Sequence, residues 1–332
     1  MKKLYFWGLF FIVVSLTSCF EDDYRIIPVP IQQVEIPYSM YEYQTYYSIH
    51  DSAIVAYNDY ADWDLGFESS EEGYRVILNS ARFMYAENTF ETDFYAVNSS
   101  NITDMKFDNS SGNLDSTAFI NWVDYSDQDN PVFNDYVYIV DRGKGEDGGS
   151  FGLKKIVIEK MELDTFYIHF SNLDNTVEAY FKIPKDSIAN FALFSFDNLG
   201  ELKISEPEKE SWDVCFTKYS TIILDDDGVP TDYLVRGVLL NPYKTIDVAL
   251  DVMNSFYDIL PGMVNEYTYS ISRDAIGYNW KIFSNNLYEI RDNYTYILKN
   301  LSGLDYKLRF TNFYNNQGEK GYPSFEIMEL SN

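Results

Sequence analysis

Trp212-Asp213-Val214-Cys215-Phe216 and Trp63-Asp64-Leu65-Gly66-Phe67 are the two stretches of sequence that decide the fold. In each stretch the large apolar residues occupy alternate positions, so they share one face of an extended strand. The two copies begin 149 residues apart. That period is too long for a solenoid or a propeller blade and is the length of a domain. The sequence therefore predicts a duplicated β structure.

Two further landmarks recur in the same order. Trp122 and Trp280 each follow an asparagine, and each lies 14 residues before a tyrosine-rich apolar run. Near the end of each half, His169-Phe170-Ser171-Asn172 corresponds to Arg309-Phe310-Thr311-Asn312. We therefore predict an all-β protein of two tandem antiparallel β domains with the same fold, over residues 38–187 and 188–332. Trp63, Trp122, Trp212 and Trp280, the four tryptophans outside residues 1–18, are expected to be largely buried.

Composition and alternation support strands rather than helices. Of the residues, 46% are apolar and 18% aromatic, which favours sheets with sizeable cores. One helix is expected, over Val248–Leu260, because apolar residues recur there at spacings of three and four before Pro261-Gly262. Asp225–Gly228 and Asn315–Gly318 read as hairpin turns. Further strands are predicted at Tyr136–Val140, Lys155–Glu159, Phe166–Phe170, Val177–Ile183, Thr221–Leu224, Tyr233–Leu240, Tyr294–Leu298, Tyr306–Phe310 and Ser324–Met328.

The N-terminal residues resemble a lipoprotein signal peptide. Residues 1–18 combine two lysines with a short apolar run, and Cys19 follows at the cleavage position, which resembles a bacterial lipobox. An ordinary secretory leader with an incidental cysteine is the alternative. Glu21-Asp22-Asp23 resembles the signal that displays Bacteroidetes lipoproteins on the outer face of the outer membrane. Residues 19–37 are then expected to form a lipidated, proline-containing extended tether.

The net charge limits which partners the protein can bind, and the cysteine content limits which disulfides it can form. The formal charge of −27 becomes −29 without Lys2 and Lys3, which disfavours nucleic acid and anionic lipid headgroups. Membrane attachment is therefore expected through acyl chains alone. With Cys19 lipidated, Cys215 is the only other thiol, so no intrachain disulfide can form. Because Cys215 corresponds to Gly66 of the first copy, we interpret it as a packed small residue rather than a reactive thiol.

Several motifs resemble cofactor or metal sites, but each has a simpler structural interpretation. Gly143–Gly148 matches a dinucleotide fingerprint in form, but it is acidic and precedes no helix, so we read it as a hairpin loop. Asp225–Asp227 and the series Asp124, Asp127, Asp129 lack the spacing of a calcium loop. Of the two histidines, His169 is expected on the outer face of its strand. No catalytic residues or metal ligands stand out, and we predict a protein that is not an enzyme.

The second copy resembles the HmuY family of haem-binding bacterial lipoproteins. The resemblance covers about residues 188–330, with the first copy matching more weakly. It rests on the Trp-Asp segment at 212–216, the strands 294–298 and 306–314, the turn at 318–321 and Ser324-Phe325-Glu326.

Such a resemblance implies an all-β surface protein that binds haem through two axial side chains and passes it to an outer-membrane receptor. The second copy contains no histidine, which excludes ligation by two histidines within it. Thioether ligation by Met253 and Met263 is the expectation that remains if haem or a related tetrapyrrole is bound. Simple packing of these methionines is the alternative, and with it a surface adhesion or interaction protein that kept the fold without haem.

Overall fold

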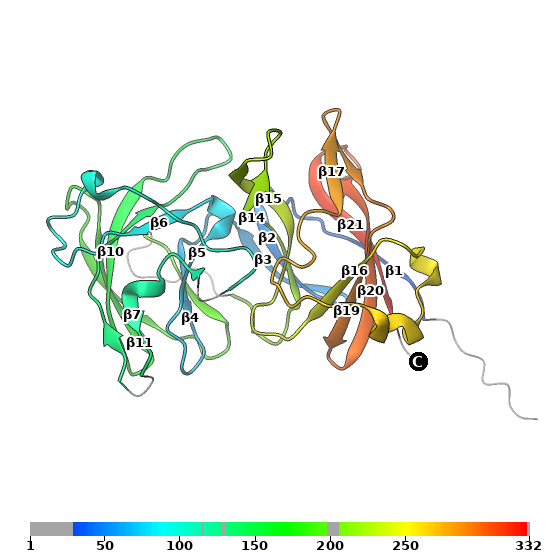
Figure 1. Ribbon diagram of the computed structural model, residues 1–332, viewed down its shortest axis with the longest axis horizontal. Coiled ribbons are helices and arrows are strands. Elements are labelled where there is room, and N and C mark those ends of the chain that lie inside the picture. The colour runs from blue at the N-terminus through cyan, green and yellow to red at the C-terminus, as the bar shows by residue number, and fades with distance from the viewer. Residues whose placement is uncertain (1–28, 114–115, 128–129, 198–205, 331–332) are drawn as a thin grey trace, which may run out of the picture.

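The computed structural model describes residues 29–113, 116–127, 130–197 and 206–330. The leader, Cys19 and the acidic run behind it lie outside these residues. The described part is built from antiparallel strands joined by turns and short 3-10 turns, as Figure 1 shows. The all-β prediction is therefore confirmed. None of the helical segments in this part is long and apolar enough to cross a membrane.

The first half forms a five-stranded and a three-stranded sheet. The five-stranded sheet has the order β12 (Ala179–Pro184), β11 (Thr165–Ser171), β10 (Leu153–Glu162), β9 (Tyr138–Asp141) and β6 (Tyr85–Asn88). The three-stranded sheet has the order β13 (Phe191–Phe194), β4 (Leu65–Glu68) and β5 (Val76–Leu78). Apolar side chains from both sheets, including Phe67, Trp122, Phe166 and Phe194, form one buried cluster between them.

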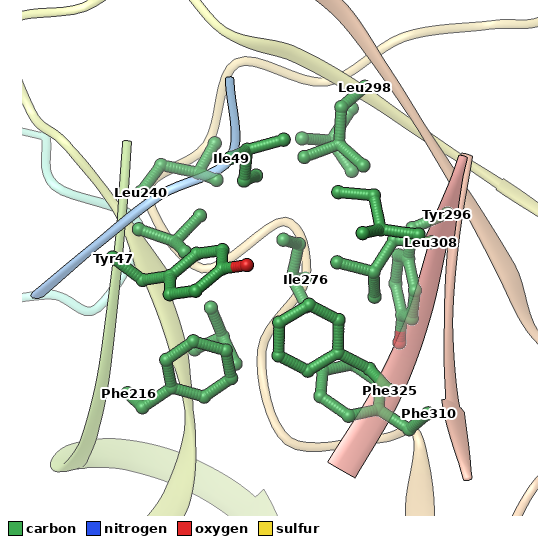
Figure 2. Packing of buried hydrophobic residues seen from close by; sticks show 14 of the residues in the cluster. Tyr47, Ile49, Phe216, Leu240, Ile276, Tyr296, Leu298, Leu308, Phe310 and Phe325 are labelled. Carbon is green, nitrogen blue, oxygen red and sulfur yellow. The ribbon is translucent and has the colours of Figure 1, made fainter. Parts of the chain in front are cut away.

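The second half repeats this arrangement with N-terminal strands added. Its five-stranded sheet has the order β1 (Gln32–Glu35), β21 (Lys320–Glu329), β20 (Leu304–Tyr314), β19 (Thr295–Leu301) and β16 (Asp247–Asp251). Its other sheet has the order β15 (Pro230–Leu240), β14 (Val214–Leu224), β2 (Tyr43–Ser48) and β3 (Ala53–Asp59). Figure 2 shows Tyr47 and Ile49 from the N-terminal segment packed into the same core as Phe216, Phe310 and Phe325.

Smaller elements connect the sheets. Two-stranded ribbons are formed by β17 (Lys281–Ser284) with β18 (Leu287–Ile290), and by β7 (Val123–Asp124) with β8 (Val132–Phe133). The 3-10 turns are η1 (Ser80–Arg82), η2 (Ser99–Asn101), η4 (Ile120–Trp122), η5 (Phe256–Asp258) and η6 (Pro261–Glu266).

The Trp-Asp segments of the two halves make matching backbone contacts. The N–H of Asp64 donates to the carbonyl of Phe194 at 2.7 Å, and the N–H of Asp213 donates to that of Tyr47 at 2.9 Å. The N–H of Phe196 and that of Ile49 donate to the carboxylates of Asp64 and Asp213 at 3.0 and 2.7 Å. Strand β2 therefore does in the second half what β13 does in the first.

Asparagines make a second matched contact. The Nδ2 of Asn79 donates to the carbonyl of Trp63 at 2.8 Å, and that of Asn241 to the carbonyl of Trp212 at 3.0 Å. Each asparagine N–H donates to the carbonyl of the neighbouring aspartate, at 2.9 and 2.8 Å. All four tryptophans are buried, as predicted: the exposed fractions of Trp63, Trp122, Trp212 and Trp280 are 7, 2, 1 and 0%.

Strand pairing crosses the predicted boundary between residues 187 and 188. Strand β13 pairs with β4 in the first half, while β1 pairs with β21 and β2 with β14 in the second. The division into 38–187 and 188–332 stays a prediction, but the sheets do not follow it. The tether over residues 19–37 likewise stays a prediction; within it, Gln32–Glu35 is strand β1, which pairs with β21.

The predicted helix over Val248–Leu260 is wrong. Asp247–Asp251 is strand β16, which pairs with β19, and only Phe256–Asp258 is helical, as the single 3-10 turn η5. The carboxylate of Asp251 accepts from the N–H groups of Met253 and Asn254 at 2.7 and 2.9 Å, which ends the strand in a tight turn. The apolar residues recur at spacings of three and four because the end of a strand and a 3-10 turn follow each other in the chain.

Candidate functional site

Two hairpins of the second half expose apolar side chains near their ends. The β14–β15 hairpin exposes Ile222, Leu224 and Tyr233 to 59, 68 and 51%. The β17–β18 hairpin exposes Phe283 and Leu287 to 60 and 57%. Both hairpins project from the same side of the molecule (Figure 1). Exposed apolar side chains near hairpin ends are candidates for contact with a ligand or a partner.

The bases of these hairpins are joined. Val238 of β15 and Gly277 exchange two backbone hydrogen bonds of 2.9 and 3.1 Å. A Cβ at Gly237 would lie 2.5 Å from the carbonyl oxygen of Gly277, so only glycine allows this approach. Lys281, the first residue of β17, donates to the carbonyl of Arg236. The hairpins therefore diverge from a fixed common base.

A surface groove of about 490 Å³ runs between the β14–β15 hairpin and the first half. Ile222 and Asp232 form one wall, and Met105 and Phe107 form the other. Tyr85 donates to the Asp232 carboxylate at 3.2 Å across this junction. Sequence reasoning did not identify Met105, because its half-buried position facing the hairpin follows from how the two halves pack.

Met253 lies between β16 and η5, and Met263 lies in η6. The chain segment that contains η5 and η6, yellow in Figure 1, lies away from the hairpin ends. The Met253 side chain is 88% exposed. Met263 is half-buried, and its sulfur accepts from the N–H of Leu260 at 3.5 Å. Neither residue lines the groove described above. Their exposed apolar neighbours are Val252, Tyr257 and Leu260.

His169 is not a surface histidine as expected, because it is only 5% exposed. It does point to the opposite side of its strand from Phe170, but the sheet is covered on that face too. Its ring stacks on Phe94 at 3.7 Å and on Tyr180 at 4.1 Å between ring centroids. Its Nε2 lies 2.7 Å from the carboxylate of Glu178. The ring is therefore fully engaged as a structural group.

Cys215 is packed and Asp225 belongs to a hairpin turn, as the sequence suggested. Cys215 is buried, and burial raises the pKa of its thiol to about 12, which leaves it protonated and unreactive. The Asp225 carboxylate accepts from the N–H groups of Asp227 and Val229 at 3.0 and 2.8 Å, as in an ordinary hairpin turn. Asp129 lies outside the described residues. Among those described, no cluster of three or more His, Cys, Asp or Glu side chains forms a metal-binding group.

The Gly143–Gly148 stretch lies in the connection from β9 to β10, as expected for a hairpin loop. It contacts the second half, because the Glu146 carboxylate pairs with Lys218 on β14. This contact between the halves was not predicted from the sequence.

Comparisons with known proteins point to one family. The family model described as HmuY protein matches residues 40–327. No curated protein matches the chain.

Three solved structures are similar. Apo PinO from Porphyromonas gingivitis has 8% identity, 91% of this chain and 98% of that chain covered, and a TM-score of 0.29. The apo HmuY analog TFO from Tannerella forsythia has 12% identity, coverages of 92 and 97%, and a TM-score of 0.20. A putative HmuY-like heme-binding protein from Bacteroides vulgatus has 16% identity, coverages of 41 and 83%, and a TM-score of 0.20. On the match over residues 40–327, which spans both halves, the chain belongs to the HmuY family.

Proposed function

We propose that this protein is a non-catalytic binding protein that captures haem or a related tetrapyrrole at the cell surface. Membership of the HmuY family supports a binding role of this kind. The observation that carries the proposal is the exposed apolar surface of Val252, Tyr257 and Leu260 beside the exposed Met253. A flat apolar macrocycle gains free energy when it covers such surface.

We further propose that the axial ligands are the thioether sulfurs of Met253 and Met263. The high exposure of Met253, beside Tyr257 and Leu260, supports this assignment because iron can approach its sulfur from solvent. Met263 must first give up its contact with the Leu260 N–H. Thioether ligation stabilises ferrous iron, so binding is expected to be tighter under reducing conditions.

The test is a haemin titration of the purified chain, followed by the Soret band under oxidising and reducing conditions. Met253→Ala and Met263→Ala are expected to shift the reduced spectrum and weaken binding. Val252→Ser and Leu260→Ser are expected to weaken binding without changing the ligand-field bands, because they remove exposed apolar surface beside Met253. Met161→Ala, in the first half, serves as the matched methionine control. No Soret band with the parent chain would refute the haem proposal.

We also propose that Cys19 carries the lipid anchor and that an outer-membrane receptor receives the ligand. Several acyl chains give stable anchoring where one binds only marginally. Cys19→Ala is therefore expected to move the protein out of the membrane fraction. Surface protease treatment of intact cells tests outward display. Retention of the variant in the membrane would contradict the anchor.

A second candidate function is non-catalytic adhesion without haem. It is favoured by exposed tyrosines, including Tyr57, Tyr95 and Tyr180 at 50, 58 and 64%, since such side chains suit protein and glycan contacts. A parent chain that shows no haem spectrum but binds a glycan array or host protein would support this alternative.

A further inference from the structure

Two cations face each other inside the sheet of the second half. Lys218 on β14 and Arg236 on β15 are register partners in the antiparallel pair. The Lys218 side chain is 1% exposed and that of Arg236 is 18% exposed. Like charges directly opposite each other destabilise a strand pair. This pair therefore needs a compensating group, in a chain whose overall charge is −27.

Aromatic rings hold these cations in place. The Lys218 Nζ lies 3.3 Å from the ring centroid of Tyr60, and the Arg236 guanidinium lies 4.3 Å from that of Tyr41. A third basic side chain, Lys281, has its Nζ 4.1 Å from the ring centroid of Trp280 and donates to the Arg236 carbonyl. Ring faces stabilise cations without neutralising them. The positive charge of the cluster therefore remains available to an anion.

The compensating carboxylate comes from the other half. Glu146, in the loop between β9 and β10, pairs with the Lys218 Nζ, and its Oε1 lies 3.6 Å from the Arg236 Nη2. The N–H of Glu146 donates to the Tyr60 hydroxyl at 3.1 Å. The other carboxylate that acts on Lys218 is that of Asp59. Two carboxylates thus face three basic side chains.

The guanidinium edge that best fits a carboxylate is incompletely used. The Arg236 Nη1 donates to the Leu234 carbonyl at 3.1 Å. Its Nε is buried and donates to none of the residues that the structure describes. The Nε and Nη2 together form the edge that binds a carboxylate through two parallel hydrogen bonds. Glu146 makes only the long Nη2 contact, so it fills this edge poorly.

The loop that carries Glu146 has a fixed base and an open tip. At the base, the N–H of Lys144 donates to the Arg82 carbonyl at 3.2 Å, and a Cβ at Gly143 would lie 1.9 Å from that oxygen. At the tip, Gly148 has a left-handed φ of 79° and no atom within 4 Å of an added Cβ. The loop is therefore held at its base and has open space around Gly148.

We propose that Lys218, Arg236 and Lys281 form a binding site for small carboxylate anions, and that Glu146 is a built-in occupant that such a ligand displaces. The ligand carboxylate would take the Nε–Nη2 edge of Arg236 and the Lys218 Nζ. Displacement of Glu146 would also release the contact between the β9–β10 loop and the second half. The site is separate from Met253 and Met263.

Isothermal titration of the full chain with citrate at low ionic strength tests this proposal. Glu146→Ala and the equal-volume Glu146→Gln are expected to bind citrate at least tenfold more tightly than the parent. Asp147→Ala is the matched control: it removes the neighbouring carboxylate, whose Oδ1 accepts from the Gly149 N–H within the same loop. It is expected to bind citrate like the parent.

Adding Arg236→Gln to Glu146→Gln is expected to abolish the gain. Circular dichroism and thermal melting establish that each variant is folded. Equal affinity of parent and Glu146→Gln would overturn the built-in occupant. Failure of Glu146→Gln to bind citrate, or citrate binding that survives Arg236→Gln, would overturn the site itself. Since no haem is present, these outcomes are independent of the tetrapyrrole proposal.

Discussion

Two buried lysines occupy matching places in the two halves, and their removal tests the internal repeat. The Lys155 Nζ donates to the carbonyls of Phe94 and Val97 at 2.6 and 2.9 Å. The Lys307 Nζ donates to the carbonyls of Phe256 and Ile259 at 2.7 and 2.9 Å. Burial lowers the pKa of both ammonium groups. Each lysine thus closes a turn over the outer face of its five-stranded sheet.

We expect Lys307→Met to destabilise the protein by roughly 2–4 kcal/mol. A buried acceptor left without a donor costs about 1–3 kcal/mol, and two carbonyls lose their donor here. The total falls in the lower half of the resulting range, because methionine also removes the penalty of burying a charge. Lys155→Met is expected to cost as much or more, since Lys155 also donates to the Asn175 side chain.

Urea unfolding gives the stability change, and amide hydrogen exchange shows where it acts. The Asp258 N–H, bonded to Ser255, is expected to exchange faster in Lys307→Met, while the Ala96 N–H, bonded to Asp93, is expected to do so in Lys155→Met. Lys160→Met, which removes an exposed pair with Glu162, is the control with little expected effect. Surface substitutions usually change the free energy of unfolding by no more than about 0.5 kcal/mol. If both Lys307→Met and Lys155→Met stay within that margin of the parent, the reasoning is refuted.

Three further variants test the buried charges. Asp64→Asn is expected to cost about 3–5 kcal/mol, because Asp64 is fully buried and pairs with Arg82 and Arg142 at 2.7 and 2.9 Å; a loss below about 1 kcal/mol in urea unfolding would contradict this. Burial lowers the pKa of Lys281 to about 7, so the unfolded state binds the extra proton above that pH. Stability should therefore rise from about pH 7 towards pH 10 by up to roughly 1.4 kcal/mol per unit, and Lys281→Met should abolish this rise. Burial raises the pKa of Glu206 to about 7, so the folded state keeps a proton that the unfolded state loses above about pH 4.3. Stability should fall between these values, and an unchanged pH profile in Glu206→Gln would show that another group is responsible.

The sequence predicted strands well where apolar residues alternate and bury one face. The stretches beginning at Trp63 and Trp212 became β4 and β14, and the turns at Asp225–Gly228 and Asn315–Gly318 lie between paired strands. The signal at these places is local, because each strand pairs with its neighbour through a short turn. The internal repeat also predicted the burial of Trp63, Trp122, Trp212 and Trp280.

Long-range pairing could not be predicted in this way. Gln32 pairs with Ile327, nearly the whole chain away, and a four-residue strand with an exposed, polar sequence has no local signal. The prediction that His169 is exposed failed for a related reason. Alternation assigns a side chain to one face of a strand but does not say what covers that face. Likewise, nothing in the composition of the Gly143–Gly148 loop indicated that Glu146 meets Lys218 across the two halves.

The N-terminal strands also constrain where the second half lies relative to the proposed anchor. Between Cys19 and Gln32, where β1 begins, the chain has 12 residues. Fully extended, this distance spans at most roughly 45 Å. Because β1 and β2 complete the sheets of the second half, the tether leads into that half rather than into the first. If Cys19 is lipidated as proposed, the half that carries Met253, Met263 and the apolar hairpins is therefore held nearest to the membrane, where an outer-membrane receptor would meet it.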